Sequence, residues 1–214
     1  MKKKGQAEDK LGLVLHIIGA ALSVPILVLC TVRGAIEYGV AGVLTGLAFS
    51  VSMLILSLFS AIYHGRCIKG KDDKFFRVMD YCSIFFLSAG AYTPIALIAL
   101  MKVEPAVAWT LFGAVWALAA WGIVMNLIGS DRFKDLSMAC YIGLSWCVIL
   151  CLPRIIALLH PVGTILMFVG AATYTAAGMV FGFDRSSKHA HSIFHILLLV
   201  GNICYGLMIL LCVL

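Results

Sequence analysis

Charged residues are what this sequence has least of. Asp, Glu, Lys and Arg together make up 12% of its 214 residues, whereas apolar residues make up 63%. With a mean hydropathy of +1.06, the chain has too little polar surface to coat a soluble globule. The scarcity of charge therefore excludes a soluble enzyme and predicts an integral membrane protein that contacts lipid. We expect it to cross the plasma membrane several times.

Two further features are missing. The eight cysteines contain no C-x-x-C pair, the spacing typical of cysteine-ligated zinc and of redox sites, so we predict neither a cysteine metal site nor a disulfide framework. The first apolar run, 11–32, lacks a clean small-x-small cleavage site and is longer than the roughly 7–15 residues of a signal-peptide core. We predict that it is retained as a membrane helix.

Long apolar runs are what the sequence does contain. A membrane helix needs about 20 residues to cross a hydrocarbon core of about 30 Å. Runs of about this length, separated by clusters of charge, lie at 11–32, 39–64, 78–101, 106–128, 136–152, 162–183 and 191–214. The predicted fold is therefore all-α, a seven-transmembrane helix bundle. We expect residues 1–10 to form a basic cytoplasmic tail and residues 11–214 a single membrane domain.

The fifth run is the least sharply bounded of the seven. Pro153 and Pro161 bracket the segment RIIALLH that follows it. Proline interrupts a helix interior but is tolerated in a first turn. This segment is therefore either a loop at the membrane surface or an extension of the fifth helix.

Positive charge is unevenly distributed between the two sides of the predicted bundle. The N-terminal tail and the second, fourth and sixth loops hold 4, 5, 2 and 2 Lys and Arg residues, 13 in all, and the sixth loop's pair is Arg185 and Lys188. The other side holds three, at Arg33, Lys102 and Arg154. By the positive-inside rule, the N-terminus is cytoplasmic and the C-terminus lies outside. Because acidic residues interleave with these cations, no nucleic-acid partner is predicted.

The few polar residues of the apolar runs collect on the predicted cytoplasmic side. Ser60 and His64 close the second run, Asp80 opens the third, and His191 with His195 opens the seventh. Residues four apart project from one face of a helix. An isolated H-x-x-x-H is weak evidence, but three neutral imidazoles at one depth suit a zinc ion, Zn²⁺, with water in its fourth position. We therefore predict that His64, His191 and His195 bind zinc.

Asp80 and Ser60 are the candidate catalytic residues beside this zinc. The motif HSIFH carries no glutamate, so a general base must come from elsewhere, and Asp80 is the carboxylate best placed for it. Asp80 would bond to the water or to a ligand imidazole, with Ser60 in a similar supporting role. The alternative for Asp80 is a charge at the membrane edge that faces water or pairs with Arg77. His16 has no partner visible in the sequence.

Six strings of this sequence carry a resemblance to a known family. They are SAIYHG at 60–65, MDYCSIFFLSAGAYTP at 79–94, LFGAVWALAAWGI at 111–123, YIGLSW at 141–146, ATYTAAGMVFG at 172–182 and HSIFHILLLVG at 191–201. In order and placement they resemble the hemolysin III family. That family belongs with the progestin and adiponectin (adipoQ) receptors in a superfamily of seven-helix proteins that also includes alkaline ceramidases.

The resemblance has consequences for the site. It implies that the three predicted ligands bind zinc and that the aspartate and serine lie beside it. The sequence departs from the family where Tyr81 and Tyr205 stand in place of common histidines, and where Ile17 takes the place of a glycine. These changes affect secondary polar contacts and leave the predicted ligands intact.

Two classes of function follow. As an enzyme, the protein would use zinc to hydrolyse a lipid amide or ester, in the manner of a ceramidase. As a non-enzymatic protein, it would lyse membranes by forming pores or would sense the state of the membrane like a receptor, with a structural zinc tying helices together. A pore should show a polar stripe along several helices. Because the polar residues collect at one end instead, we favour the hydrolase.

Overall fold

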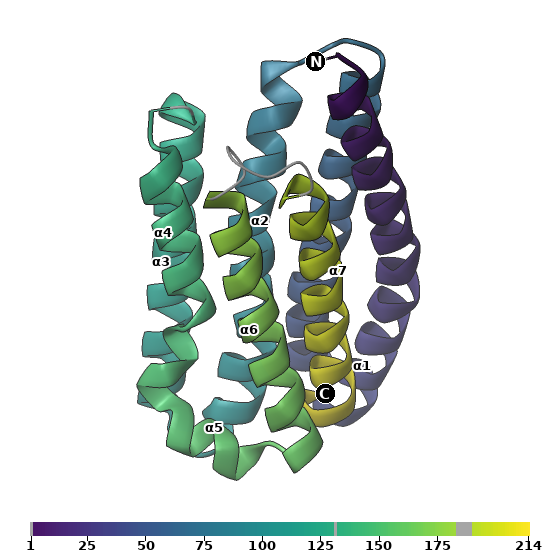
Figure 1. Ribbon diagram of the computed structural model, residues 1–214. Helices are drawn as coiled ribbons and strands as arrows, with labels where there is room; N and C mark the ends of the chain where they lie inside the picture. Colours follow the sequence, from purple (N-terminus) through teal and green to yellow (C-terminus); the bar gives the residue numbers. More distant parts are fainter. Residues whose placement is uncertain (1, 131, 183–189) are drawn as a thin grey trace.

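The computed structural model describes residues 2–130, 132–182 and 190–214, and it forms a bundle of helices (Figure 1). Its α-helices are α1 (Lys2–Ile68), α2 (Lys74–Pro94), α3 (Pro105–Gly129), α4 (Lys134–Ser145), α5 (Leu152–Leu158), α6 (Pro161–Gly182) and α7 (Ala190–Met208). Short π and 3-10 segments are η1 (Ile95–Ala99), η2 (Leu100–Lys102), η3 (Cys147–Cys151) and η4 (Ile209–Val213). The all-α class is confirmed. Arg185 and Lys188, which enter the charge count, lie outside the described residues.

Within the described ranges, six helices are long and apolar enough to cross a membrane. Five of them span 20–29 residues, which suits a hydrocarbon core of about 30 Å at 1.5 Å per residue. All six helices carry apolar side chains on the outside of the bundle. For example, the side chains of Ile36, Ile128 and Leu150 are 75–77% exposed. Such a surface belongs against lipid tails, where the helices satisfy their own backbone groups. The predicted multi-pass membrane protein is confirmed at this level.

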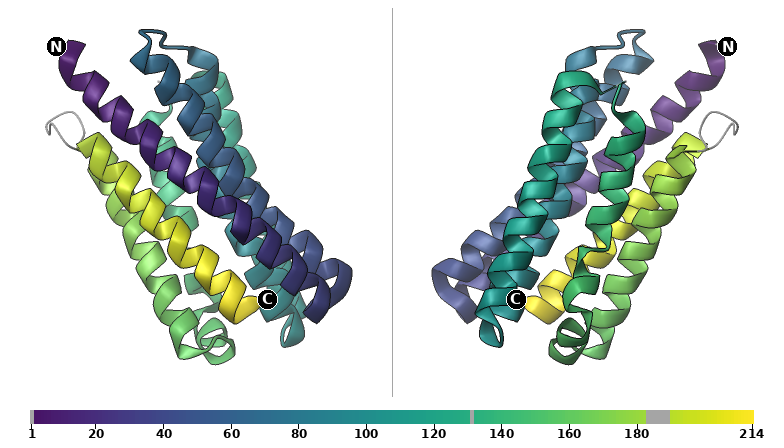
Figure 2. Two further views of the ribbon diagram at one scale, coloured as in Figure 1. Left: turned by 90° about the vertical axis from the view of Figure 1, so that its right-hand side faces the viewer. Right: turned by 90° about the vertical axis from the view of Figure 1, so that its left-hand side faces the viewer.

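The first of the six, Ala7–Ile68, is 62 residues long, and it is broken at Gly39. The φ of 59° and ψ of −137° at Gly39 are not helical, and glycine adopts a positive φ without steric cost. The chain reverses there, so residues 2–38 and 40–68 run back along each other (Figure 2). Gly34 faces Gly42 so closely that a Cβ on Gly34 would lie 2.5 Å from the Gly42 carbonyl oxygen. We call these two parts the first and second segments of α1.

The fifth predicted run is interrupted. α4 ends at Ser145, and the chain continues through η3 into α5, where Pro153 occupies the first turn and costs no helical hydrogen bond. The segment RIIALLH is therefore largely an extension of the fifth element, because Leu152–Leu158 is helical. An ion pair between Arg154 and Glu104 ties this end to the start of α3.

Large apolar side chains fill the interior of the bundle. Phe49, Met53, Leu87, Leu100 and Met208 are each at most 2% exposed and belong to one continuous cluster. This packing holds α1, α2 and α7 at fixed separations. The N- and C-termini lie toward opposite ends of the bundle (Figure 1). The N-terminal end also carries the loop between α1 and α2 and the start of α7, and the candidate site lies there.

Candidate metal centre

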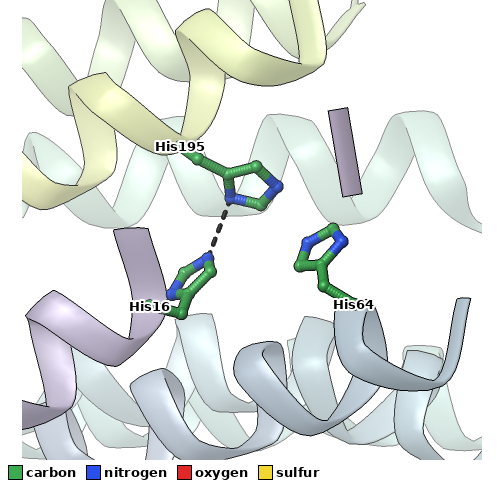
Figure 3. Close-up of side chains that lie close together, drawn as sticks. All are labelled: His16, His64 and His195. Carbon is green, nitrogen blue, oxygen red and sulfur yellow. Dashed lines mark hydrogen bonds between the residues drawn. The ribbon is translucent and has the colours of Figure 1, made fainter. Parts of the chain in front are cut away.

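Four histidines meet toward the N-terminal end of the bundle. His16 comes from the first segment of α1, His64 from the second, and His191 and His195 from the first turns of α7. Figure 3 shows His16, His64 and His195 converging from these three directions. The centroid of the His195 ring lies 4.8 Å from that of His16, 4.7 Å from that of His64 and 4.6 Å from that of His191.

These imidazoles are buried and most of their nitrogens are paired. His16, His64 and His195 are 6%, 0% and 2% exposed. His16 Nε2 lies 2.9 Å from His195 Nδ1, and His195 Nε2 lies 3.1 Å from His191 Nε2. His64 Nδ1 donates to Asp9 Oδ1 over 3.0 Å. Within the part of the chain that the structure describes, His64 Nε2 is buried without a hydrogen-bond partner.

Glycine provides the room for the His64 ring. Gly12, in the first segment of α1, faces this ring, and a Cβ at Gly12 would lie 3.0 Å from His64 Nε2 and 3.0 Å from Cδ2. Contacts this short force a neighbour to move. The close approach of the two α1 segments therefore depends on the missing side chain.

Among the described residues, two sets of three side chains could hold a metal ion, and in each set the three potential ligand atoms all lie within 4.8 Å of one another. One set is His16, His64 and His195, and all three residues are buried; the other is Asp9, His64 and His191. Each set contains two of the three predicted ligands, and His64 belongs to both. The buried triad could therefore bind a metal ion, and imidazole nitrogens suit zinc, copper, iron or nickel rather than magnesium or calcium.

The predicted pair Asp80 and Ser60 is also brought together. Ser60 Oγ, on the second segment of α1, donates a hydrogen bond to Asp80 Oδ1, on α2. Ser60 is 1% exposed and Asp80 is 7% exposed. Asp80 is thus a buried carboxylate, and it does not face water at the membrane edge. Burial of such a group is costly unless it is hydrogen-bonded, which makes the bond from Ser60 important for holding it there.

An internal cavity of ≈ 70 Å³ joins this pair to the histidines. Ser60, Asp80, His191 and His195 form its polar lining on the side of α1, α2 and α7. Apolar residues such as Phe85 and others of α2 and α7 line it as well. The Ser60–Asp80 pair and two imidazoles therefore face one shared, mostly apolar space.

A second, open cavity of ≈ 430 Å³ also has His191 in its lining. Its lining includes the acidic residues Glu8, Asp9 and Asp72. His191 lines both cavities. His191 thus borders both an open cavity with acidic residues and a mostly apolar cavity.

Sequence reasoning missed His16 and Asp9. It gave His16 no partner and placed Asp9 in a basic tail, whereas both belong to α1 and contact the predicted ligands. The signal available was their spacing, because residues seven apart share a helix face. That spacing shows which face they occupy, and only the reversal at Gly39 shows which residues the face meets.

The fold and the cluster define a class of protein: a multi-pass helical membrane protein with a buried imidazole cluster suited to a metal ion. A sequence model of the Haemolysin-III related family matches residues 6–206. The chain belongs to this family, which confirms the resemblance. It is 30% identical over 195 residues to "Hemolysin-3" of Bacillus cereus, covering 91% of this chain and 87% of that protein. It is 33% identical over 196 residues to "Hemolysin-3 homolog" of Bacillus subtilis (strain 168), covering 91% and 89%.

Proposed function

We propose that this protein is a zinc-dependent hydrolase of a lipid amide or ester. The observation that carries the proposal is the shared cavity, in which the Ser60–Asp80 pair and two imidazoles face a mostly apolar space inside a membrane bundle. A lipid is the substrate class that such a space favours, because its acyl chain matches the apolar lining. Reaction at this depth keeps bulk water away from the acyl group.

We further propose seven membrane crossings, with the N-terminus in the cytoplasm of the cell and the protein in the plasma membrane. The two segments of α1 each exceed the roughly 20 residues that a crossing needs, and the termini lie toward opposite ends of the bundle. The excess of Lys and Arg on the N-terminal side supports the orientation. The metal centre then lies near the cytoplasmic face.

His64, His191 and His195 are the proposed zinc ligands. His64 Nε2 is buried and unpaired among the described residues, and a bound metal ion would complete such an atom. His195 Nε2 and His191 Nε2 lie 3.1 Å apart, and both belong to the first turns of α7. In this assignment His16 and Asp9 hydrogen-bond to ligand imidazoles through His195 Nδ1 and His64 Nδ1. Such bonds orient the rings and raise their basicity.

The chemistry divides between the metal and Asp80. When bound, zinc activates a water molecule and polarises a carbonyl oxygen. Ser60 engages Asp80 Oδ1, so we assign Oδ2 as the base that takes a proton from the attacking water. The water oxygen bonds to the acyl carbon, the carbon–nitrogen or carbon–oxygen bond breaks, and Asp80 returns the proton to the leaving amine or alcohol. The products are a fatty acid and that amine or alcohol.

The test is a lipid-hydrolysis assay on the full chain purified in lipid nanodiscs, with its metal content measured alongside. Asp80→Asn should retain zinc and lose about 10²–10⁴-fold in rate, the usual effect of removing a general base. Ser88→Ala is the matched control, because Ser88 is a buried α2 residue whose Oγ, within the described chain, bonds only to the Ile84 carbonyl of its own helix. Equal rates for wild type and Asp80→Asn would contradict the proposal.

Membrane lysis is the second candidate, because the similar proteins from both Bacillus species carry the name hemolysin. A pore needs a polar lining, whereas large apolar side chains fill the bundle interior. The same nanodisc preparations, moved into dye-loaded liposomes, distinguish the two candidates. Dye release by wild type, with no hydrolysis by any variant, would favour lysis.

A further inference from the structure

The wall of the internal cavity opposite the histidines is also polar. Asn126 and Ser130 come from the end of α3 and the residue just beyond it, and Ser137 and Tyr141 come from α4. Asn126, Ser130 and Tyr141 are only 2–3% exposed. These four residues, which we call the α3–α4 wall, face the same space as Asp80, and the proposed reaction gives them no role.

Two hydroxyls of this wall lack partners. Tyr141 Oη and Ser130 Oγ are buried, and neither makes a hydrogen bond to any described residue. A buried polar group without a partner is destabilising, so native proteins seldom keep one unless a ligand, an ion or water completes it. Two such groups on one cavity wall mark a place where a polar ligand is expected.

The amide of the wall is fixed in orientation. Asn126 Nδ2 donates to the Gly122 carbonyl over 2.8 Å and to Ser137 Oγ over 2.9 Å. Both amide hydrogens are thereby used, which leaves Oδ1 as an acceptor. The wall therefore combines an acceptor, Asn126 Oδ1, with two free hydroxyls that donate or accept. A ligand hydroxyl, which does both, matches this set.

The charge of the ligand is also constrained. Among the described residues that line the cavity there is neither Lys nor Arg. A phosphate group at the α3–α4 wall would therefore be buried without a Lys or Arg side chain among the described lining residues to pair with, which is unfavourable. The wall suits an uncharged ligand.

We propose that Asn126, Ser130, Ser137 and Tyr141 form the binding subsite for the uncharged, hydroxyl-bearing head group of the lipid substrate. The inference rests on the proposed hydrolase, since it places the acyl carbonyl of the same molecule at Asp80 and the histidines. It specifies the substrate class further: the leaving amine or alcohol carries free hydroxyls and no phosphate. The subsite determines which lipids react, and the opposite wall carries out the reaction.

The experiment compares three synthetic probes with the same twelve-carbon acyl amide. One carries a propanediol head group, one carries its methyl ethers, and one carries its phosphate monoester. Binding to the full chain is measured in detergent micelles on an Asp80→Asn background, which separates binding from hydrolysis. The diol should bind best, and Tyr141→Phe or Ser130→Ala should each weaken its binding about fivefold to tenfold, as expected for one lost hydrogen bond. Binding of the methyl ethers should not change in these variants.

Matched controls come from positions outside the cavity. Tyr205→Phe changes a tyrosine of α7 that is 5% exposed, and Ser88→Ala changes a buried serine of α2; neither residue lines the cavity. Both should leave diol binding at the wild-type level. Thermal unfolding checks folding, because loss of an unpaired hydroxyl should not lower the unfolding temperature of ligand-free Tyr141→Phe. The rise in that temperature caused by the diol should shrink in Tyr141→Phe.

The outcomes separate this inference from the proposed function. Diol binding that depends on Tyr141 supports the subsite even if no variant hydrolyses any probe, a result that would overturn the hydrolase alone. Hydrolysis that depends on Asp80, with diol and ether bound equally by wild type and Tyr141→Phe, would overturn the subsite alone. In that case the wall holds ordered water only.

Discussion

The two walls of the internal cavity differ in how far their polar groups are already paired. On the wall of α1, α2 and α7, Asp80 receives a bond from Ser60, and His195 is bonded on both ring nitrogens. On the α3–α4 wall, Tyr141 Oη and Ser130 Oγ have no partner among the described residues. Groups that react must be held in one orientation, whereas groups that bind a head group gain most when the ligand supplies their missing partner. The contrast agrees with the proposed division of roles, in which one wall carries out the reaction and the other binds the head group.

The largest expected effect is loss of the metal. Replacing both His191 and His195 with alanine removes two of the proposed ligand imidazoles from α7, so we expect no bound zinc and no hydrolysis. Metal content of the purified full chain, measured by mass spectrometry, is the readout. His160→Ala, at an exposed position outside the cluster, should bind zinc as wild type does. Full zinc occupancy in the double variant would show that His191 and His195 do not bind the metal.

A smaller effect is expected at Asp9. Asp9→Asn keeps the size of the side chain but weakens the bond that His64 Nδ1 donates, and loss of such an outer partner typically lowers metal affinity about 10–100-fold. Competition with a zinc-binding dye measures the change. Asp72→Asn serves as the control, since Asp72 lines the same open cavity, whereas the partner of His64 Nδ1 in the described chain is Asp9. If both variants lose affinity equally, the acidity of the cavity matters and the orientation of His64 does not.

Gly12 provides a test of packing rather than of charge. Gly12→Ala introduces a Cβ 3.0 Å from the His64 ring, so either the ring or the first segment of α1 must shift, and we expect zinc affinity to fall about tenfold. Gly113→Ala is the matched control, because a Cβ at Gly113 meets nothing within 4 Å and alanine favours helix. Unchanged zinc affinity in Gly12→Ala would mean that the segments of α1 adjust freely around the cluster.

The smallest effect compares two buried tyrosines in the absence of ligand. Tyr92 Oη accepts from the Val148 amide over 3.0 Å and donates to the Ser145 carbonyl over 3.2 Å. Tyr92→Phe should therefore cost about 1–2 kcal/mol in the free energy of unfolding. Tyr141→Phe should cost nothing, because its hydroxyl has no partner in the described chain. Denaturation in mixed detergent micelles measures both. A loss in Tyr141→Phe equal to that in Tyr92→Phe would show that bound water already completes the α3–α4 wall.

Features that depend on residues close together in the sequence were predicted better than contacts between distant parts of the chain. The spacing of four between His191 and His195 is a property of a single helix, and these two imidazoles do lie together, with their Nε2 atoms 3.1 Å apart. The resemblance to the hemolysin III family, carried by short strings such as HSIFH, was confirmed over nearly the whole chain. The irregular path from α4 through η3 to α5 was only partly foreseen, because the prolines allowed two readings and packing decided between them.

The partners of His64 and His195 could not be predicted in this way. Asp9 and His64 are 55 residues apart, and His16 and His195 are 179 apart. Each pair meets only because the chain reverses at Gly39 and α7 packs against α1. A helical pattern shows the face that a residue occupies, and it contains no information about the facing helix. The α3–α4 wall escaped notice for the same reason, since serine and tyrosine in apolar runs look like ordinary packing residues.

By itself, the sequence determined that this protein is a multi-pass, all-α membrane protein of the Haemolysin-III related family, because scarcity of charge and long apolar runs leave no other way to bury its surface. It also singled out Ser60, His64, Asp80, His191 and His195 as one group of polar residues within the apolar runs. Only the tertiary structure decided that His16 and Asp9 join them and that Tyr141 faces the same cavity. The physical reason is that contacts between helices depend on how the side chains of both helices fit together. At Gly12, for example, the absence of a side chain leaves room for the His64 ring, and this matters only once the two segments of α1 pack together.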